Sequence, residues 1–222
     1  MPAVPSPRQP AADARDWFLT PAGRAVLASE DAVVAQALCD RPGLPWLWCG
    51  PDPGEEATEG ATGRGLCLSP AGEGWHGAVE CALPLPLPSE SFGTVVLQHV
   101  ARPAGERGPA LLEEAARLLV PGGRLWLFLL NPLAPYRWRW RGNGISASEP
   151  LVWRKRLRAV GLVPDPVSQG LGPSWSIQVS PLPQQGPGLR AAYLLRAEKR
   201  AFGMTPIRSG RRQSPGTVPA TA

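Results

Sequence analysis

The clearest hydrophobic pattern in the chain lies in residues 91–143 and predicts one β-α-β unit. Residues 94–98 form a short β-branched apolar run, and residues 125–130 are apolar at every position, as in strands covered on both faces. Pro121-Gly122-Gly123 ends a predicted helix between them. Apolar residues of that helix recur on one face: Leu111, Leu112, Ala115, Leu118 and Leu119. A crossover helix between two buried strands indicates a parallel sheet and an α/β fold.

Weaker patterns flank this unit. Residues 22–39 are predicted to form a helix that is capped by Thr20 or begins at Pro21, and residues 44–49 a short apolar strand. Weak strands are expected at residues 65–68 and 76–79. These elements extend the predicted α/β fold toward the N-terminus.

After the central unit, Ser148 is the expected N-cap of a helix that runs to Val160 and is closed by Gly161. Residues 174–179 and 191–197 have strand character and are predicted to pair as an antiparallel hairpin at the sheet edge.

The chain has 222 residues, which suits one α/β domain. We expect that domain at residues 17–208, with residues 1–16 and 209–222 disordered. There is no apolar run long enough to span a membrane, and the first residues lack the apolar core of a signal peptide. The sequence therefore predicts a cytoplasmic protein.

The four cysteines lack CxxC spacing and lie in apolar contexts, which favours buried reduced thiols over a zinc site or disulfides. HxH, HExxH and paired-carboxylate patterns are also absent from the sequence. Metal-dependent hydrolysis and glycoside chemistry therefore have no support, and no metal ligand is predicted.

Charge is divided unevenly along the chain. Residues 1–122 carry 8 basic and 15 acidic side chains, a net charge of −7, whereas residues 123–222 carry 15 basic and 3 acidic, a net charge of +12. Arg137, Arg139 and Arg141 alternate with aromatic residues, and Arg154 and Lys155 belong to the basic face of a predicted helix. These residues indicate either a surface for nucleic acid or another acidic partner, or a solvated basic face.

Several motifs, taken in order, resemble the class I S-adenosylmethionine-dependent methyltransferases, and above all their small bacterial type 11 group. The central motifs are Leu85-Pro86, Ser91-Phe92, VVLQHV at residues 95–100 and LLEEAARLLVPGGRLWLFLLNP at residues 111–132. The terminal motifs are Trp17, Thr20-Pro21, Gly23 and Glu30 at the start and Lys199-Arg200 with MTPIR at residues 204–208 at the end.

This resemblance implies a Rossmann-like, mostly parallel sheet with helices on both faces and a terminal antiparallel hairpin. It implies S-adenosylmethionine as cofactor, bound at the carboxyl ends of the first strands. It further implies the following cofactor-binding residues: Gly50, Gly54, Glu80, Cys81 and Gln98. His99 is either a catalytic base beside the transferred methyl group or a packed, hydrogen-bonded residue.

The cofactor motifs depart from the family pattern. The acidic residue that binds the ribose hydroxyls in the family is missing near Leu68-Ser69-Pro70. Pro51 and Pro53 remove two backbone donors from the glycine loop. The resemblance therefore implies a methyltransferase of unknown acceptor with weak cofactor binding. The alternative is a catalytically inactive domain of the same fold that binds nucleic acid or another acidic partner.

Overall fold

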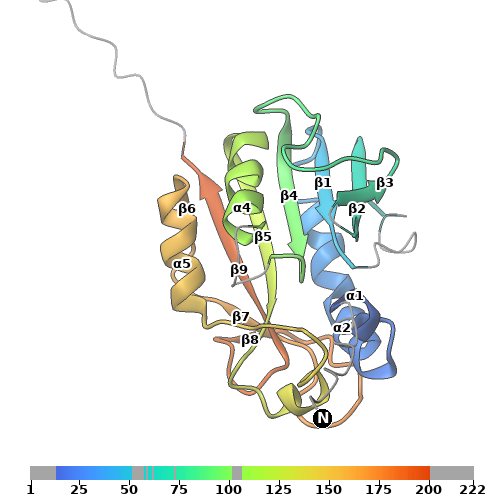
Figure 1. Ribbon diagram of the computed structural model, residues 1–222. Coiled ribbons are helices and arrows are strands. Elements are labelled where there is room, and N and C mark those ends of the chain that lie inside the picture. The colour runs from blue at the N-terminus through green and yellow to red at the C-terminus, as the bar shows by residue number, and fades with distance from the viewer. Residues whose placement is uncertain are drawn as a thin grey trace, which may run out of the picture.

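The computed structural model describes residues 14–51, 58, 60–61, 63–72, 74–101 and 107–200. These residues form a mixed sheet flanked by helices on both faces (Figure 1). The predicted α/β class is therefore confirmed. The first helix, α1 (Ala14–Phe18), begins before the expected start of the domain at residue 17. None of the helices within the described ranges has the length and apolarity needed to cross a membrane.

The centre of the sheet is parallel, as the β-α-β pattern predicts. The strand order is β3-β2-β1-β4-β5-β9-β7-β8, and β6 also pairs with β9. Strand β1 (Trp46–Cys49) lies between β2 (Gly65–Ala71) and β4 (Phe92–Gln98), and β4 pairs with β5 (Leu119–Leu130). Residues 94–98 lie in parallel register with residues 124–128. The two central strands of the prediction are thus confirmed as neighbours.

The connection between them differs in one detail. Helix α4 (Arg107–Leu118) ends before the Pro121-Gly122-Gly123 turn, and residue 119 already belongs to β5. Gly122 has a φ of +78°, a left-handed conformation that glycine adopts without strain. The turn therefore shapes the start of β5 rather than the end of the helix.

Both edges of the sheet are antiparallel. On one side, β3 (Gly74–Gly77) folds back on β2, so that the weak strand expected at residues 76–79 begins and ends earlier. On the other side, β9 (Ala192–Lys199) is antiparallel to β5, β6 (Leu162–Pro164) and β7 (Gln169–Leu171), and β8 (Gln184–Gln185) pairs with β7. The antiparallel terminal strand is as the resemblance implies.

The predicted hairpin partner of that strand is wrong. Residues 174–179 form no strand, and β7 occupies the position beside β9. Gly172, at a φ of +81°, turns the chain away after β7, and Trp175, Ile177 and Val179 remain exposed. Leu171 is fully buried instead, so β7 contributes more to the core than residues 174–179 do, although it is the shorter segment.

Side chains of β5 alternate between two apolar layers. Leu125, Leu127 and Leu129 face the layer that includes α4 and α5 (Pro150–Ala159). Trp126, Phe128 and Leu130 face the layer that includes α1 and α2 (Pro21–Leu38). A strand that is buried on both faces has no polar side, which explains its continuous apolar sequence.

Helix ends follow local chemistry. Thr20 is the N-cap of α2, because its hydroxyl accepts a hydrogen bond from the Gly23 amide at 3.2 Å. The expected Ser148 cap of α5 is wrong: Glu149 occupies the N-cap position without a side-chain hydrogen bond, and the Ser148 carbonyl accepts from the Tyr193 hydroxyl. Gly161, at a φ of +81°, follows that helix as predicted.

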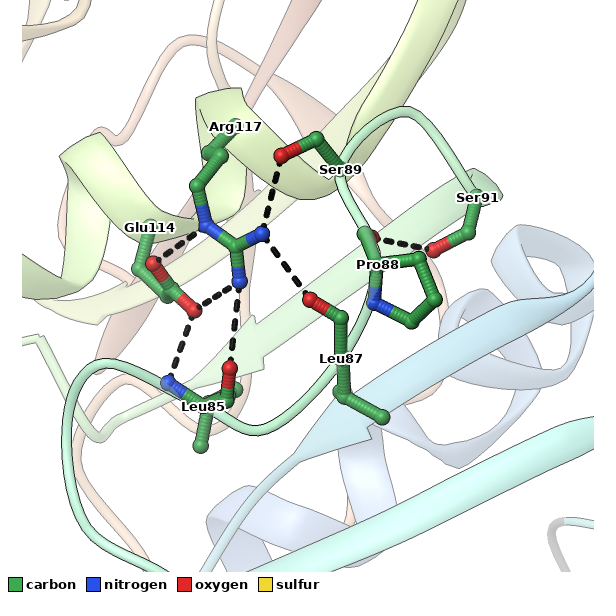
Figure 2. A network of polar contacts seen from close by, with 7 residues as sticks. All are labelled: Leu85, Leu87, Pro88, Ser89, Ser91, Glu114 and Arg117. Atoms are coloured by element: carbon green, nitrogen blue, oxygen red, sulfur yellow. Dashed lines mark hydrogen bonds and ion pairs between the residues drawn. The ribbon is translucent and has the colours of Figure 1, made fainter.

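A polar network ties α4 to the segment before β4 (Figure 2). Glu114 accepts hydrogen bonds from Arg117 Nη2 at 2.6 Å and from the Leu85 amide at 2.8 Å. Arg117 also donates to the carbonyl of Leu87 and to the hydroxyl of Ser89, each at 2.9 Å. The proline-rich segment is thereby fixed against the helix without a strand or helix of its own.

Candidate active site

The carboxyl ends of β1, β4 and β5 meet at one edge of the sheet, the lower end in Figure 1. Gly50, His99 and Asn131 follow these three strands directly. Open parallel sheets bind their ligands at this edge. It therefore contains the region in which the sequence-predicted site residues should meet.

Gly50 lies against protein atoms on its side-chain face. Its amide donates to the Leu68 carbonyl at 3.0 Å, which continues the contact between β1 and β2. A Cβ at this position would lie 2.9 Å from Trp48 Nε1 and 3.2 Å from Gln98 Oε1. The packing of these two side chains is thus one physical reason for glycine here. Gly54, its predicted partner in the loop, lies outside the described residues.

Gln98 belongs to a buried polar chain that links β1, β4 and α2. Trp48 Nε1 donates to Gln98 Oε1 at 3.2 Å, and Gln98 Nε2 donates to Glu30 Oε2 at 2.8 Å. Both ends of the amide are therefore bound by protein groups on the α2 side of the sheet. Any contact of Gln98 with a cofactor would have to come from its backbone.

His99 is held by the same carboxylate. Its Nε2 lies 3.1 Å from Glu30 Oε1 and 3.0 Å from Glu30 Oε2, and the two side chains are 1% and 0% exposed. The imidazole stacks on Phe18 with ring centroids 4.8 Å apart. When Glu30 is ionised, Nε2 carries the hydrogen that it donates, and Nδ1 of a neutral ring carries the lone pair.

The backbone of His99 is strained, and one ring nitrogen has no partner among the described residues. Its φ is +56°, which is unusual for a residue other than glycine. Nδ1 is buried and makes no hydrogen bond with any described residue. Strained backbone and unpaired buried polar atoms concentrate at functional sites, because each has an energetic cost.

A small cavity of about 30 Å³ adjoins this imidazole. His99, Phe18 and Trp153 line it together with Ala101, the end of β5 and residues 144–148. It has room for a water molecule or two, whereas cofactor sites usually measure roughly 300–1,000 Å³. The described cavity is therefore too small to hold a cofactor, which would have to lie outside it along the strand ends.

The other predicted residues lie beside β3. The Cys81 amide and carbonyl both pair with Trp75, at 3.0 and 2.7 Å. Burial raises the pKa of the Cys49 thiol, and the neighbouring thiols of Cys81 and Cys67 raise that pKa further. Cys81 is thus close to the end of β1, whereas Glu80 has an exposed side chain 3.2 Å from His76 Nδ1.

The cysteines are free, but only Cys49 is fully buried. Cys67 and Cys81 are half-buried, and Cys39 is exposed, so the prediction of four buried thiols is wrong for these three. Asn131 closes β5 as a turn: its amide nitrogen donates to the carbonyls of Gly188 and Arg190, and its oxygen accepts from the Leu133 amide.

Glu30, Phe18 and Trp48 were not among the predicted site residues. Only Glu30 carried a signal, because it belongs to the N-terminal motif with Trp17, Thr20 and Gly23. The structure explains why Trp17 and Gly23 occur together in that motif. A Cβ at Gly23 would lie 2.3 Å from the Trp17 carbonyl, so glycine allows α1 to fold tightly onto α2 and to place Phe18 against His99.

The basic residues divide between two places. Arg137 and Arg139 belong to the short helix η1 (Pro135–Arg139), which lies with Arg141 at the carboxyl end of the sheet. Arg154 and Lys155 belong to α5, along the flank beside β6 (Figure 1). The structure therefore does not bring all five predicted residues into one cluster.

No protein-family model and no curated protein matches this sequence. Solved structures match its fold. A SAM-dependent methyltransferase from Thermotoga maritima is 16% identical with a TM-score of 0.54, and the match covers 82% of this chain and 97% of that one. The 1,6-didemethyltoxoflavin-N1-methyltransferase of Burkholderia thailandensis, solved with S-adenosylhomocysteine, is 15% identical with a TM-score of 0.53, over 89% and 94% of the two chains.

A third match is a methyltransferase solved in complex with a methyltransferase activator of Haloferax volcanii. It is 15% identical with a TM-score of 0.52, over 84% of this chain and 97% of that chain. At this level of identity, the three likenesses establish the fold. The chain has the class I fold of S-adenosylmethionine-dependent methyltransferases.

The described residues fit an adenosyl group in part. Gly50 follows β1 without a side chain and Cys81 lies close by, but Trp48 and Gln98 already fill the space on its side-chain face. The end of β2 offers Ser69, Pro70 and Ala71, and none of these is the carboxylate that would accept hydrogen bonds from ribose hydroxyls. The described residues therefore match an adenosyl group only in having glycine at the end of β1, and the end of β2 offers the ribose no carboxylate.

Proposed function

We propose that the protein is an S-adenosylmethionine-dependent methyltransferase of the type 11 group that acts in the bacterial cytoplasm. The observation that carries this proposal is the imidazole of His99, which Glu30 orients beside a cavity at the carboxyl edge of a methyltransferase fold, and whose Nδ1 makes no hydrogen bond with the described residues. The cofactor, when bound, supplies an electrophilic methyl group. The residues proposed to hold it are Gly50, Gly54, Glu80, Cys81 and the Gln98 backbone.

His99 is the proposed catalytic residue, and Glu30 is its positioning residue. Nδ1 accepts the proton that the acceptor loses as its nucleophilic atom bonds to the methyl carbon. Glu30 fixes the ring so that this nitrogen, and not Nε2, carries the lone pair. The cavity lining is mostly apolar, which favours an acceptor atom that enters as a neutral hydroxyl or amine.

Calorimetric titration with S-adenosylmethionine and S-adenosylhomocysteine tests the proposal. The acidic side chain that binds the ribose hydroxyls in the family is missing, which weakens cofactor binding by about ten- to a hundredfold relative to a site that has it. We therefore expect dissociation constants of roughly 0.1–1 mM. The absence of binding at several millimolar would contradict the proposal and favour the catalytically inactive alternative. Submicromolar binding would show that other residues replace the missing carboxylate.

A matched pair of variants tests whether cofactor binding depends on the packing around Gly50. Gly50→Ala places a methyl group 2.9 Å from Trp48, whereas a Cβ at Gly60 meets open space. We expect Gly50→Ala to weaken cofactor binding and Gly60→Ala to leave it unchanged. Circular dichroism of both variants separates a change at the site from a loss of fold. Equal affinities would show that cofactor binding does not depend on the packing of Gly50 against Trp48 and Gln98.

We also infer that the acceptor or a partner is acidic and approaches through η1. Residues 131–148 and 166–195 contain no Asp or Glu, but they include Arg137, Arg139, Arg141 and Arg190. Replacement of the three η1-region arginines by Gln should shift elution from heparin to lower salt more than Arg154→Gln with Lys155→Gln. An equal shift would instead assign retention to total charge.

A further inference from the structure

We propose that the end of the molecule formed by η1 and residues 174–179 binds single-stranded nucleic acid by stacking bases on Trp138 and Trp175. This inference narrows the proposed acidic partner to one chemistry. It does not require that the cofactor binds, because the surface itself carries the contacts.

The first step is the exposure of two indoles in a basic setting. Trp138 is 65% exposed and Trp175 is 69% exposed, although tryptophan normally buries most of its surface. The Cζ atoms of Arg137 and Arg141 lie 5.7 and 5.0 Å from the Trp138 ring. An exposed indole flanked by guanidinium groups offers both a flat apolar face and positive charge.

The second step is that hydrogen bonds and buried aromatic rings attach η1 to α1 and α2. The Tyr136 hydroxyl donates to the Ala22 carbonyl at 3.1 Å, and Trp17 Nε1 donates to the Arg139 carbonyl at 2.9 Å. Trp140 is buried and meets Trp17 edge to face with ring centroids 5.7 Å apart. Two aromatic residues are thus fixed in the core, and Trp138 between them is directed outward. A rigid surface loses little conformational entropy on binding.

The third step links the two exposed rings. Arg139 Nη2 donates to the Trp175 carbonyl at 3.1 Å, while its Cζ lies 5.2 Å from the Tyr136 ring. One arginine therefore connects η1, which presents Trp138, to the loop that presents Trp175. Proteins generally bind single strands by stacking bases on aromatic side chains and pairing arginines with phosphates. In a duplex the base faces are covered, so they cannot stack on a protein side chain in this way.

Anionic membrane is the competing partner, because Leu133 and Leu182 are also exposed apolar residues. The observations favour nucleic acid. The guanidinium groups lie over the Trp138 ring, a layered arrangement that further planar bases can extend, and the surface lies at the sheet edge where the proposed methyl transfer would need its acceptor.

The test is fluorescence anisotropy of labelled oligo(dT) and oligo(rU) of about 12 nucleotides, with the full chain and without cofactor. Contacts of three arginines with phosphates give a slope of about −2 in log K against log salt. Affinity should then fall roughly 20-fold between about 50 and about 200 mM salt. Trp138→Ala and Trp175→Ala should each weaken binding about 5- to 150-fold.

Leu133→Ala is the matched control, because Leu133 is 66% exposed and lies in the same segment. It should leave affinity unchanged, as should Arg158→Gln on α5. The proposal is overturned if neither oligonucleotide binds, if the tryptophan variants bind like the control, or if a duplex of equal length or vesicles of phosphatidylglycerol compete as well as the single strand. Calorimetry with S-adenosylmethionine on the same variants keeps this outcome separate from that of the proposed enzyme activity.

Discussion

At the residue scale, Glu30 determines how the site is held. Its carboxylate accepts from Gln98 Nε2 and contacts His99 Nε2, with both oxygens buried. Partners of a buried carboxylate lose their hydrogen bonds when it is removed, and the unpaired groups cannot be solvated.

We therefore expect Glu30→Ala to lower the free energy of unfolding by about 3–5 kcal/mol, and Glu30→Gln by about 1–3 kcal/mol, because the amide keeps one acceptor. Urea unfolding of the two variants measures the difference. Gln36→Ala, on the same helix with an exposed side chain, is the control. Equal losses for both Glu30 variants would show that the shape and the single acceptor kept by glutamine contribute nothing, and that both carboxylate oxygens are required.

The cysteines provide a second residue-scale prediction. Burial raises the pKa of Cys49, and to a smaller extent those of Cys67 and Cys81, so their thiols are less ionised than ordinary cysteines at neutral pH. The thiolate is the reactive form. With iodoacetamide at about pH 7.5, Cys39 should be modified first and Cys49 only after unfolding. Mass spectrometry of peptides over time identifies the order, and early modification of Cys49 would contradict the buried position.

At the scale of elements, the contact between α4 and residues 85–89 depends on Glu114 and Arg117. The hydrogen bond from Arg117, the bond from the Leu85 amide and the Arg117 charge lower the pKa of Glu114 despite its burial. A carboxyl group whose pKa is lower in the folded state stabilises the fold above its unfolded pKa of about 4.3, and this contribution is lost as pH falls through the folded pKa.

Arg117→Gln should therefore lower stability most near pH 7 and progressively less below about pH 4. Thermal unfolding of both proteins between pH 7 and pH 3 measures this convergence. Glu113→Gln, one residue away and exposed, should leave the pH profile unchanged. A constant difference across the range would show that Arg117 acts only through its other hydrogen bonds, to the carbonyls of Leu85 and Leu87 and to the hydroxyl of Ser89.

The elements that could be predicted from sequence are those with strong local patterns. Residues 94–98 and 125–130 are apolar without interruption, and α2 carries both a threonine cap and a proline at its first turn. Residues 174–179 misled the prediction because alternation of apolar and polar residues also suits an extended exposed loop. Only the position of Gly172 and the burial of Leu171 distinguish the true strand.

The site was harder to predict than the fold. Gly50, Gln98 and His99 lie where strand order places them, because each ends or follows a parallel strand. The contact between Glu30 and His99 joins residues 69 positions apart, and no local pattern records which side chain of α2 will reach β4. The order of the motifs indicated Glu30, but only the structure shows that its carboxylate contacts His99.

At the scale of the whole molecule, β5 is the common support of both apolar layers. It pairs with β4 and β9, and its side chains alternate between the two faces. Leu127 is fully buried at its centre. Disruption here should therefore affect the sheet and both helical layers together.

We expect Leu127→Asp to prevent folding. An unpaired buried carboxylate costs several kcal/mol, and with the lost apolar contacts this approaches the total stability of an ordinary domain, about 5–15 kcal/mol. Leu133→Asp makes the same chemical change at an exposed position and should retain the wild-type transition. Circular dichroism and size-exclusion chromatography of both variants measure the outcome. If Leu127→Asp kept a cooperative transition, the two layers would not depend on β5 as one folding unit.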